Sequence, residues 1–242
     1  MLSLAAVSAG YGSFQALFGV SLEVPQGEAV GVIGPNGAGK TTLMRAISGL
    51  IPLREGAMSI EGRPMDGLPA HKIIEQGIAR TFQIPRPFRK LSLRENVALA
   101  AYYGEAGKIT RDEATNRAKE ALEMVGLPSD ADAQTGGLGA AALKKLELAR
   151  ALATKPKLLL ADESLGGLDH AEMERAADML GAIRSRMGIT IVWVEHIMGV
   201  LMRVVDRVIV LDHGEKIFEG TPVQASVDPR VTEVYLGKKK AS

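Results

Sequence analysis

The residues Gly34-Pro35-Asn36-Gly37-Ala38-Gly39-Lys40-Thr41 match the pattern G-x-x-x-x-G-K-[ST] in full. An apolar run, Val30 to Ile33, comes directly before them. Leu43, Ala46 and Ile47 follow at the spacing of one helical face. A strand, a glycine-rich loop and a helix in this order are typical of a phosphate-binding loop, so the stretch predicts nucleotide binding.

The residue types of this loop suit phosphate chemistry. Glycines permit positive φ angles, so that successive N–H groups can surround phosphates at a helix N-terminus. Lys40 can reach the β- and γ-phosphates, and the Thr41 hydroxyl can ligate Mg²⁺. The predicted nucleotide-binding residues of this loop are Gly34, Pro35, Asn36, Gly37, Ala38, Gly39, Lys40, Thr41 and Thr42.

Two acids and a histidine follow other apolar runs. Asp162 and Glu163 end the run that begins at Leu158, and His196 follows the run from Ile191 to Val194. Beside a phosphate-binding loop, Asp162 is expected to hold Mg²⁺, and Glu163 to orient and deprotonate the attacking water. Ligands bind at the carboxyl ends of strands in open α/β sheets, so His196 is expected at the same site.

The apolar runs predict a parallel sheet that is buried on both faces. The runs are Ala29 to Ile33, Leu158 to Ala161, Ile189 to Val194 and Val208 to Leu211. Helical patterns cover Asp112 to Val125 and Ala171 to Arg184, and no strand pattern occurs between Ile84 and Leu152. The last 35 or so residues are expected to return to short strands, with Asp212-His213-Gly214 as a hairpin turn. We therefore predict an α/β fold of the P-loop NTPase (RecA-like) type, with a parallel-sheet core, a small antiparallel β portion and an inserted helical subdomain.

Composition excludes several classes of protein. The 242 residues contain no cysteine and carry a net charge of +1. A disulfide framework, a thiolate nucleophile and a cysteine metal site are thereby excluded, and no global field attracts nucleic acid. No window approaches the roughly 20 apolar residues that span a bilayer, and the start lacks the pattern of a secretory signal. We expect a cytoplasmic chain that does not bind nucleic acid.

Taken together, these motifs resemble the nucleotide-binding subunit of ABC transporters over about residues 2–237. The features that carry the resemblance are the loop, the strand that ends in Asp162-Glu163, Gly167-Leu168-Asp169, and His196. Other stretches are similar to the ATP-binding component of branched-chain amino-acid importers: Ala79 to Gln83, Pro87 to Arg89, Arg94 to Val97, Glu195 to Met198, and Asp228 to Gly237. The resemblance implies one ATPase domain over residues 1–237, with a core of 1–83 and 153–237, a helical subdomain of 84–152, and a basic tail of 238–242.

The resemblance also assigns roles to single residues. Gln83 corresponds to a glutamine that senses the γ-phosphate and Mg²⁺, Tyr11 to an aromatic residue that stacks on adenine, and Asp169 to the acid of a loop between two ATPase subunits. Residues 84–88 correspond to the surface that receives a helix of the membrane permease. The implied ligands are ATP and Mg²⁺. The implied partners are a second ATPase subunit, a permease and, indirectly, an extracytoplasmic solute-binding protein, which places the chain peripherally at the cytoplasmic face of the membrane.

One segment departs from the family pattern. Where the family carries a signature close to Leu-Ser-Gly-Gly-Gln, this chain has Leu138-Gly139-Ala140-Ala141-Ala142, just before a helix from Leu146 to Leu152. The serine hydroxyl, the second glycine and the glutamine are absent. A heterodimer in which the partner brings an intact signature is therefore expected, with a homodimer as the alternative. A working variant that uses backbone N–H groups remains a further alternative.

Other functions stay open at this point. A lipid or lipopolysaccharide exporter ATPase has a closely similar sequence, and a non-transport ABC ATPase is a second alternative. A P-loop kinase or GTPase would leave Gln83 and His196 without a role. The ATPase subunit does not touch the transported solute, so branched-chain amino acids are expected only through the resemblance, with amides, urea or aromatic acids as alternatives.

Overall fold

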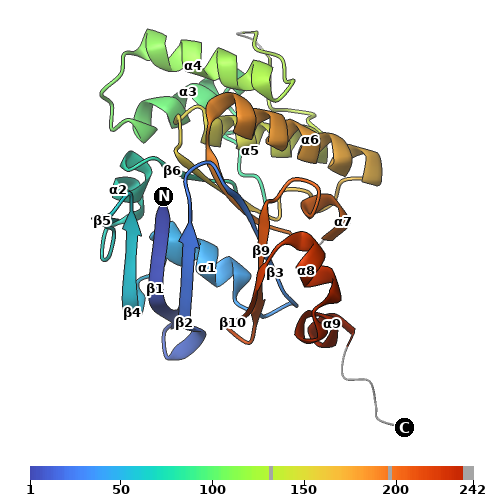
Figure 1. Cartoon of the computed structure of the whole chain (residues 1–242). Coiled ribbons are helices and arrows are strands. Elements are labelled where there is room, and N and C mark those ends of the chain that lie inside the picture. Colours follow the sequence, from blue (N-terminus) through green and yellow to red (C-terminus); the bar gives the residue numbers. More distant parts are fainter. Residues whose placement is uncertain (131–132, 196–197, 237–242) are drawn as a thin grey trace. The chain divides into compact units, whose positions relative to one another are not determined.

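The computed structural model describes residues 1–130, 133–195 and 198–236 (Figure 1). Internal contacts divide the chain into two units. The first comprises Met1–Ile73 and Thr190–Ser242, and the second comprises Ile74–Ile189. Helix α2 (Ala70–Glu75) lies where the chain passes from the first unit into the second.

The first unit contains an antiparallel sheet with the strand order β2-β1-β4-β5 (Figure 1). Its strands are β1 (Leu2–Tyr11), β2 (Phe14–Val24), β4 (Leu53–Ile60) and β5 (Arg63–Pro64). Leu2 pairs with Val24 on one side and with Ile60 on the other. All three side chains are buried, so one face of this sheet forms part of the core.

The same unit contains the parallel strands that the sequence predicts. β3 (Ala29–Ile33) lies between β8 (Thr190–Val194) and β9 (Arg207–Asp212) and is parallel to both. Every residue of β3 and β8 is buried, which explains their continuous apolar sequences. β10 (Glu215–Gly220) returns antiparallel to β9. The turn between them has positive φ angles at His213 and Gly214, as expected for the predicted hairpin.

The prediction of short strands to the end of the chain is wrong beyond β10. Two helices follow, α8 (Pro222–Val227) and α9 (Pro229–Leu236). The capping signals explain the helix α8: Thr221 and Gln224 form a reciprocal capping box, with Pro222 in the first turn. The other helices of this unit are α1 (Lys40–Ile47) and α7 (Met198–Leu201).

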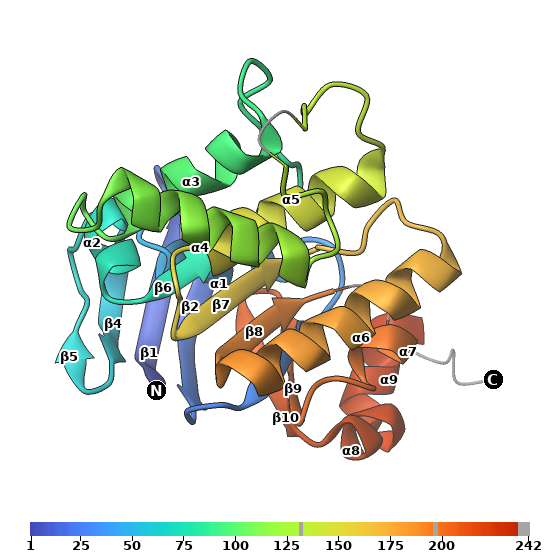
Figure 2. The same cartoon turned by 90° about the horizontal axis from the view of Figure 1, so that it is seen from above.

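The second unit pairs two parallel strands and contains the longer helices (Figure 2). β6 (Ile78–Arg80) lies beside β7 (Leu158–Asp162). The helices are α3 (Leu93–Gly104), α4 (Arg111–Met124), α5 (Ala140–Leu152) and α6 (His170–Met187). α4 and α6 confirm the predicted helices, and the described part of 84–152 holds no named strand. The predicted subdomain boundaries at 84 and 152 stay a prediction.

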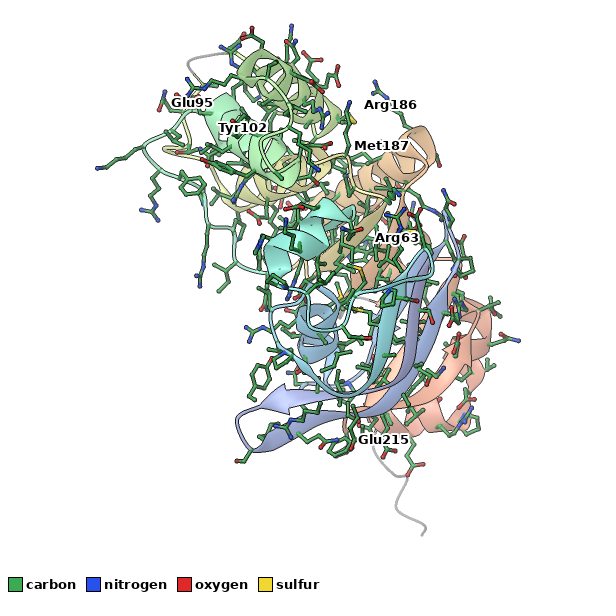
Figure 3. The ribbon with its side chains drawn as sticks, turned by 90° about the vertical axis from the view of Figure 1, so that its left-hand side faces the viewer. Arg63, Glu95, Tyr102, Arg186, Met187 and Glu215 are labelled. Atoms are coloured by element: carbon green, nitrogen blue, oxygen red, sulfur yellow. The ribbon has the colours of Figure 1, made fainter. Side chains whose placement is uncertain are left out.

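Small side chains let α3, α4 and α5 pack against one another. Ala101 of α3 and Ala114, Ala118 and Ala121 of α4 are buried, and each of the three helices contacts the other two. Glu95, at the start of α3, closes a capping box with Ser92, and Tyr102 lies further along the same helix (Figure 3). Within the described ranges, no helix is long and apolar enough to cross a membrane.

Candidate functional site

The loop of residues 34–41 joins β3 to α1, and Lys40 is folded against it. The Lys40 ammonium donates to the carbonyl oxygen of Gly34 at 2.8 Å and to that of Pro35 at 2.9 Å. Lys40 is buried although it is charged. These contacts hold the ammonium at the loop and at the start of α1. The glycine-rich motif and the helix that follows it predict phosphates at this place.

Two glycines are required by the path of this loop. Gly34 has φ 150°, and a Cβ on it would lie 2.1 Å from the Leu211 carbonyl oxygen. Gly39 has φ 100°, and a Cβ there would lie 2.8 Å from Leu17 Cδ2 and 2.9 Å from the Ala16 carbonyl oxygen. Any other side chain would therefore push the loop away from β2 or β9.

The start of α1 suits an anion. Gly39 is its N-cap and offers no side chain to the first N–H groups, and the first turn contains no acidic residue. The first N–H groups of a helix and the helix dipole favour negative charge, so this point suits a phosphate. Thr41 and Thr42 lie in this first turn.

An open groove of about 790 Å³ runs along the outside of the loop. Its walls are residues 35–38, the hairpin at Asp212 and His213, and one side of α9 with Arg230 and Glu233. Sequence reasoning did not identify this groove, because the helix α9 that forms one wall was expected to be a strand.

Tyr11 ends β1 within the same unit. Its hydroxyl accepts a hydrogen bond from Arg45 Nη1 at 3.3 Å, and the Arg45 guanidinium lies 5.6 Å from the ring centroid. The residue is 39% exposed, so part of the ring can stack on a planar ligand. Its predicted contact with adenine stays a prediction.

In the second unit, two of the predicted catalytic side chains meet. The Gln83 amide donates to a carboxylate oxygen of Glu163, although 80 positions separate the two residues. Glu163 follows β7 with φ 45°, an uncommon backbone for a residue other than glycine. Its carbonyl oxygen accepts a hydrogen bond from Lys144 Nζ at 2.9 Å.

Asp162 is the last residue of β7 and is 2% exposed. One carboxylate oxygen, Oδ2, pairs with Arg80 Nη2 at 2.7 Å. The other, Oδ1, is buried and has no hydrogen-bond partner among the described residues. An ionised oxygen in this position is costly unless a cation or water satisfies it, so the residue fits the predicted Mg²⁺ contact.

The start of α5 lies within the degenerate signature, as we call the segment Leu138-Gly139-Ala140-Ala141-Ala142 that departs from the family pattern. Gly139 is the N-cap of the helix, without a side-chain hydrogen bond, and Ala140, Ala141 and Ala142 form its first turn. The helix therefore begins six residues before the predicted Leu146. Gly139 and Ala140 are exposed, so the first N–H groups of α5 can reach a ligand or a partner.

Three further predictions have different outcomes. Asp169 is the exposed N-cap of α6, and its carboxylate accepts from the Glu172 N–H at 2.8 Å. The predicted docking surface is apolar and exposed, with 69% exposure at Ile84 and 51% at Phe88. His196 lies outside the described residues, as does the tail of residues 238–242.

Sequence reasoning missed several residues that contact the predicted site in the second unit. Arg80 pairs with Asp162, Lys144 holds the Glu163 backbone, and Glu147 is buried on α5. Arg80 and Asp162 end two strands that pair in parallel, which no local pattern reveals. No local sequence pattern singles out Glu147 either, because its burial and its ion pair with Arg150 are visible only in the structure.

Comparisons with known proteins show which family the chain resembles. A family model for ABC transporters matches residues 17–166. The high-affinity branched-chain amino acid transport ATP-binding protein BraF of Pseudomonas aeruginosa is 32% identical over 250 residues, which cover 98% of each chain. The Fe(3+) ions import ATP-binding protein FbpC of Streptomyces avermitilis is 37% identical over 229 residues, which cover 95% of this chain and 65% of that protein. Among solved structures, a dimeric ATP-binding cassette in a post-hydrolysis state with ADP and phosphate has a TM-score of 0.81 at 29% identity, covering 92% of this chain and 99% of that one.

Proposed function

Because the chain belongs to the ABC transporter family, whose ATP-binding cassettes are ATPases that power transport, we propose that it energises uptake of branched-chain amino acids or related small solutes through a membrane permease. The observation that carries this proposal is the alignment with BraF over 98% of both chains. FbpC has a higher sequence identity to this chain than BraF has, over a shorter alignment, and it is named for iron import. Both names support import, whereas they differ in the solute.

We assign the phosphate contacts to the loop and to α1. The N–H groups of residues 36–42 surround the phosphates, Lys40 contacts the β- and γ-phosphates, and Tyr11 stacks on adenine. Thr41 and Asp162 would hold Mg²⁺, with Gln83 as a third contact. Bound Mg²⁺ supplies positive charge to the phosphate oxygens during hydrolysis.

Glu163 is the general base in this proposal. Its carboxylate takes a proton from the attacking water as the bond from water oxygen to the γ-phosphorus forms and the bond to the β-phosphate oxygen breaks, which gives ADP and phosphate. The hydrogen bond from Gln83 to that carboxylate supports a shared role for the two side chains. His196 is assigned to the same step by its position in the sequence.

Two ATPase subunits enclose each ATP in this proposal. One contributes its phosphate-binding loop, and the other contributes the N-terminus of its signature helix and the loop at Asp169. Leu138-Gly139-Ala140-Ala141-Ala142 lacks a hydroxyl at that helix, so we propose a heterodimer in which the partner brings an intact signature. The dimeric cassette among the solved structures supports pairing as such.

Exposed apolar side chains support docking to a permease. Ile84 and Phe88 are exposed and lie in the segment that directly follows Gln83, so a helix that binds there would lie close to Gln83 along the chain. We propose a peripheral position at the cytoplasmic face of the membrane, with the extracytoplasmic solute-binding protein acting only through the permease.

Solute uptake in the source cells tests the function. We expect Lys40→Ala to abolish uptake of radiolabelled leucine, because the variant loses a charge-assisted phosphate contact. Lys119→Ala, which removes an exposed lysine of α4, is the matched control and should leave uptake unchanged. Unchanged leucine uptake in the Lys40 variant would reject branched-chain cargo, and lost efflux of a lipid would favour the exporter alternative.

Co-purification tests the partners. A tagged chain isolated from membranes in mild detergent should bring an integral membrane protein and a second ATPase in a fixed ratio. Phe88→Asp should release the membrane protein but keep ATP binding, because Phe88 belongs to the docking segment and not to the loop. Recovery of the chain with nucleic acid and without a membrane protein would favour the non-transport alternative.

A further inference from the structure

Helix α5 carries three charged residues at intervals of three: Lys144, Glu147 and Arg150. Residues at this spacing share one helical face, which is solvated on most helices. Here Glu147 is only 5% exposed, and Lys144 and Arg150 are partly buried. Buried charged side chains need hydrogen-bond or ion-pair partners, and each of these three residues has a specific partner.

Lys144 holds the turn that carries Glu163. Its ammonium donates to the Glu163 carbonyl oxygen at 2.9 Å. Glu163 has φ 45°, a strained conformation that persists only where the surrounding structure fixes it. A charge-assisted hydrogen bond to this carbonyl is suited to fix the backbone and, through it, the direction of the carboxylate.

Glu147 and Arg150 hold the segment that carries Gln83. The Phe82 N–H acts on the Glu147 carboxyl and opposes the rise in its pKa that burial causes. Arg150 donates to the Arg86 carbonyl oxygen at 3.2 Å, and its guanidinium lies 5.6 Å from the Phe88 ring centroid. Glu147 and Arg150 also pair with each other at 2.8 Å.

We propose that this row is a clasp that positions Glu163 against Gln83, with Lys144 as the positioning residue for the general base. The proposal rests on the proposed hydrolytic function and deepens it. Gln83 and Glu163 come from distant parts of the sequence, and their side chains meet in one hydrogen bond. Because side chains of the one helix α5 bond to both backbone segments, the helix keeps the two groups at a fixed separation. The same helix begins at the degenerate signature.

The clasp also connects two surfaces within one unit. A helix docked on Phe88 would press on Arg150, and a phosphate at the start of α5 would act on the same helix one turn before Lys144. Movement at either surface therefore reaches the Glu163 backbone through α5. A displacement of about 1 Å at a reacting group can cost about 100-fold in rate, so a small shift of this helix is sufficient to control hydrolysis.

Lys145 provides a matched control on the same helix. It has the same side chain one position later, and its ammonium points toward Gly126, at the end of α4. Replacement of Lys145 changes net charge and helix composition as replacement of Lys144 does. It leaves the hydrogen bond to Glu163 in place.

The test uses the full chain in complex with its ATPase partner and permease, and measures kcat, KM for ATP and ATP affinity. We expect Lys144→Met to lower kcat about 10- to 100-fold while KM and ATP affinity stay near the parental values, because the base is displaced and the phosphate loop is not. Lys144→Arg, which retains a long cationic donor, should recover most of the rate. Lys145→Met should match the parent.

A double variant separates positioning from general loss of structure. In the Glu163→Gln background, Lys144→Met should cause no further loss, because it acts through the group already removed. An additional loss of the same size, an equal loss in Lys145→Met, or a parental kcat in Lys144→Met would overturn the proposal. If Lys144→Met does not fold, Lys144→Gln takes its place with the same expectations. A parent complex that binds but never hydrolyses ATP would reject the hydrolytic function, and the clasp with it.

Discussion

At the scale of single residues, two neighbouring acids have opposite environments. Asp162 is buried and paired with Arg80, whereas Glu163 is partly exposed and contacts Gln83 through its carboxylate. A paired, buried carboxylate suits a fixed cation contact. A more accessible one suits exchange of a proton with water. These different environments support the proposed roles, with Asp162 as the metal contact and Glu163 as the general base.

We predict that Glu163→Gln keeps ATP binding and lowers turnover by about 100-fold or more, because an amide preserves the shape but cannot accept the proton. Equilibrium binding of a fluorescent ATP analogue and a phosphate-release assay measure the two properties. Lys40→Ala is the contrasting variant and should weaken binding itself. Parental turnover in the Gln variant would show that Glu163 is not the base.

Stability should depend on pH through Glu147. Burial raises the pKa of this carboxyl above its ordinary value of 4.5, against the opposing effects of Arg150 and the Phe82 N–H. Below about pH 4.5 the group is protonated in both states. As the pH rises from there toward the raised pKa, the unfolded chain ionises first, so the free energy of unfolding falls. Urea unfolding should show that the free energy of unfolding of the parent, relative to that of Glu147→Gln, decreases between about pH 4.5 and the raised pKa.

Glu95 gives the opposite sign and serves as the control. Hydrogen bonds from the Ser92 backbone and side chain lower the pKa of this carboxyl below 4.5. Its contribution is present above pH 4.5 and is lost as the pH falls through the lowered pKa. The free energy of unfolding of the parent, relative to that of Glu95→Gln, should therefore increase with pH. If this difference changed with pH in the same direction for the Glu147 and Glu95 variants, the two assigned pKa shifts would be contradicted.

At the scale of elements, the phosphate loop depends on how closely β2 and β9 approach it. We predict that Gly39→Ala destabilises the chain by about 1–3 kcal/mol and weakens ATP binding, because φ 100° is unfavourable for alanine and the new Cβ meets Leu17 and Ala16. Thermal unfolding and ATP titration measure both effects. Gly136→Ala is the control, since its Cβ would meet nothing within 4 Å, and its stability should change by less than about 0.5 kcal/mol. Equal stability of the two variants would refute the steric explanation.

Elements with strong local signals could be predicted from the sequence. β3, β7, β8 and β9 are apolar runs because both faces are buried, and the loop before α1 carries a complete motif. β1 and β2 gave no such signal: exposed and buried residues are mixed along them, and register shifts interrupt their pairing. The prediction of short strands fails at α8, where the reciprocal capping box of Thr221 and Gln224 favours a helix.

In the candidate site, too, only residues that belong to a motif or to a family resemblance could be predicted from the sequence. Lys40, Asp162 and Glu163 follow from motifs, and Gln83 follows from a family resemblance. Lys144, Glu147 and Arg150 could not be predicted, because their importance comes from backbone atoms of segments about 20 and 65 positions away in the chain. A hydrogen bond to a carbonyl oxygen leaves no pattern in the sequence of the acceptor segment.

At the scale of the whole molecule, α5 determines what this chain offers to a partner. Ala140 and Ala141, in its first turn, stand where the family signature has glycines, and each favours the helix by up to about 1 kcal/mol. They provide no hydroxyl for a phosphate. The start of α5 is therefore favoured as a helix but lacks a hydroxyl donor. The residues to which we assign hydrolysis, in the loop and at Asp162 and Glu163, are all present.

The two ATP sites of the complex should consequently differ in activity. In the proposed heterodimer, the site built on this chain's loop would face the partner's signature, whereas the partner's loop would face Gly139 and the alanines. Removal of one preorganised donor costs about 2.7–4 kcal/mol of transition-state stabilisation, so the second site should be slower by about 100- to 1,000-fold. We predict that Lys40→Ala abolishes ATPase activity of the complex, and that the corresponding change in the partner leaves most of it.

Restoring the missing donor tests the same asymmetry from the other side. Gly139→Ser places a hydroxyl at the N-cap of α5, and Ala142→Gln completes the polar pair of the signature. Serine is a favourable N-cap, so the substitution should not cost stability. In a complex that carries Lys40→Ala, where only the weak site remains, the restored signature should raise ATPase activity toward that of the strong site. Gly136→Ser, which adds a hydroxyl before the helix and outside the signature, is the control. Equal losses from the two loop variants, or brisk ATPase activity of this chain alone, would show that the Gly139 and alanine segment already works through its backbone N–H groups.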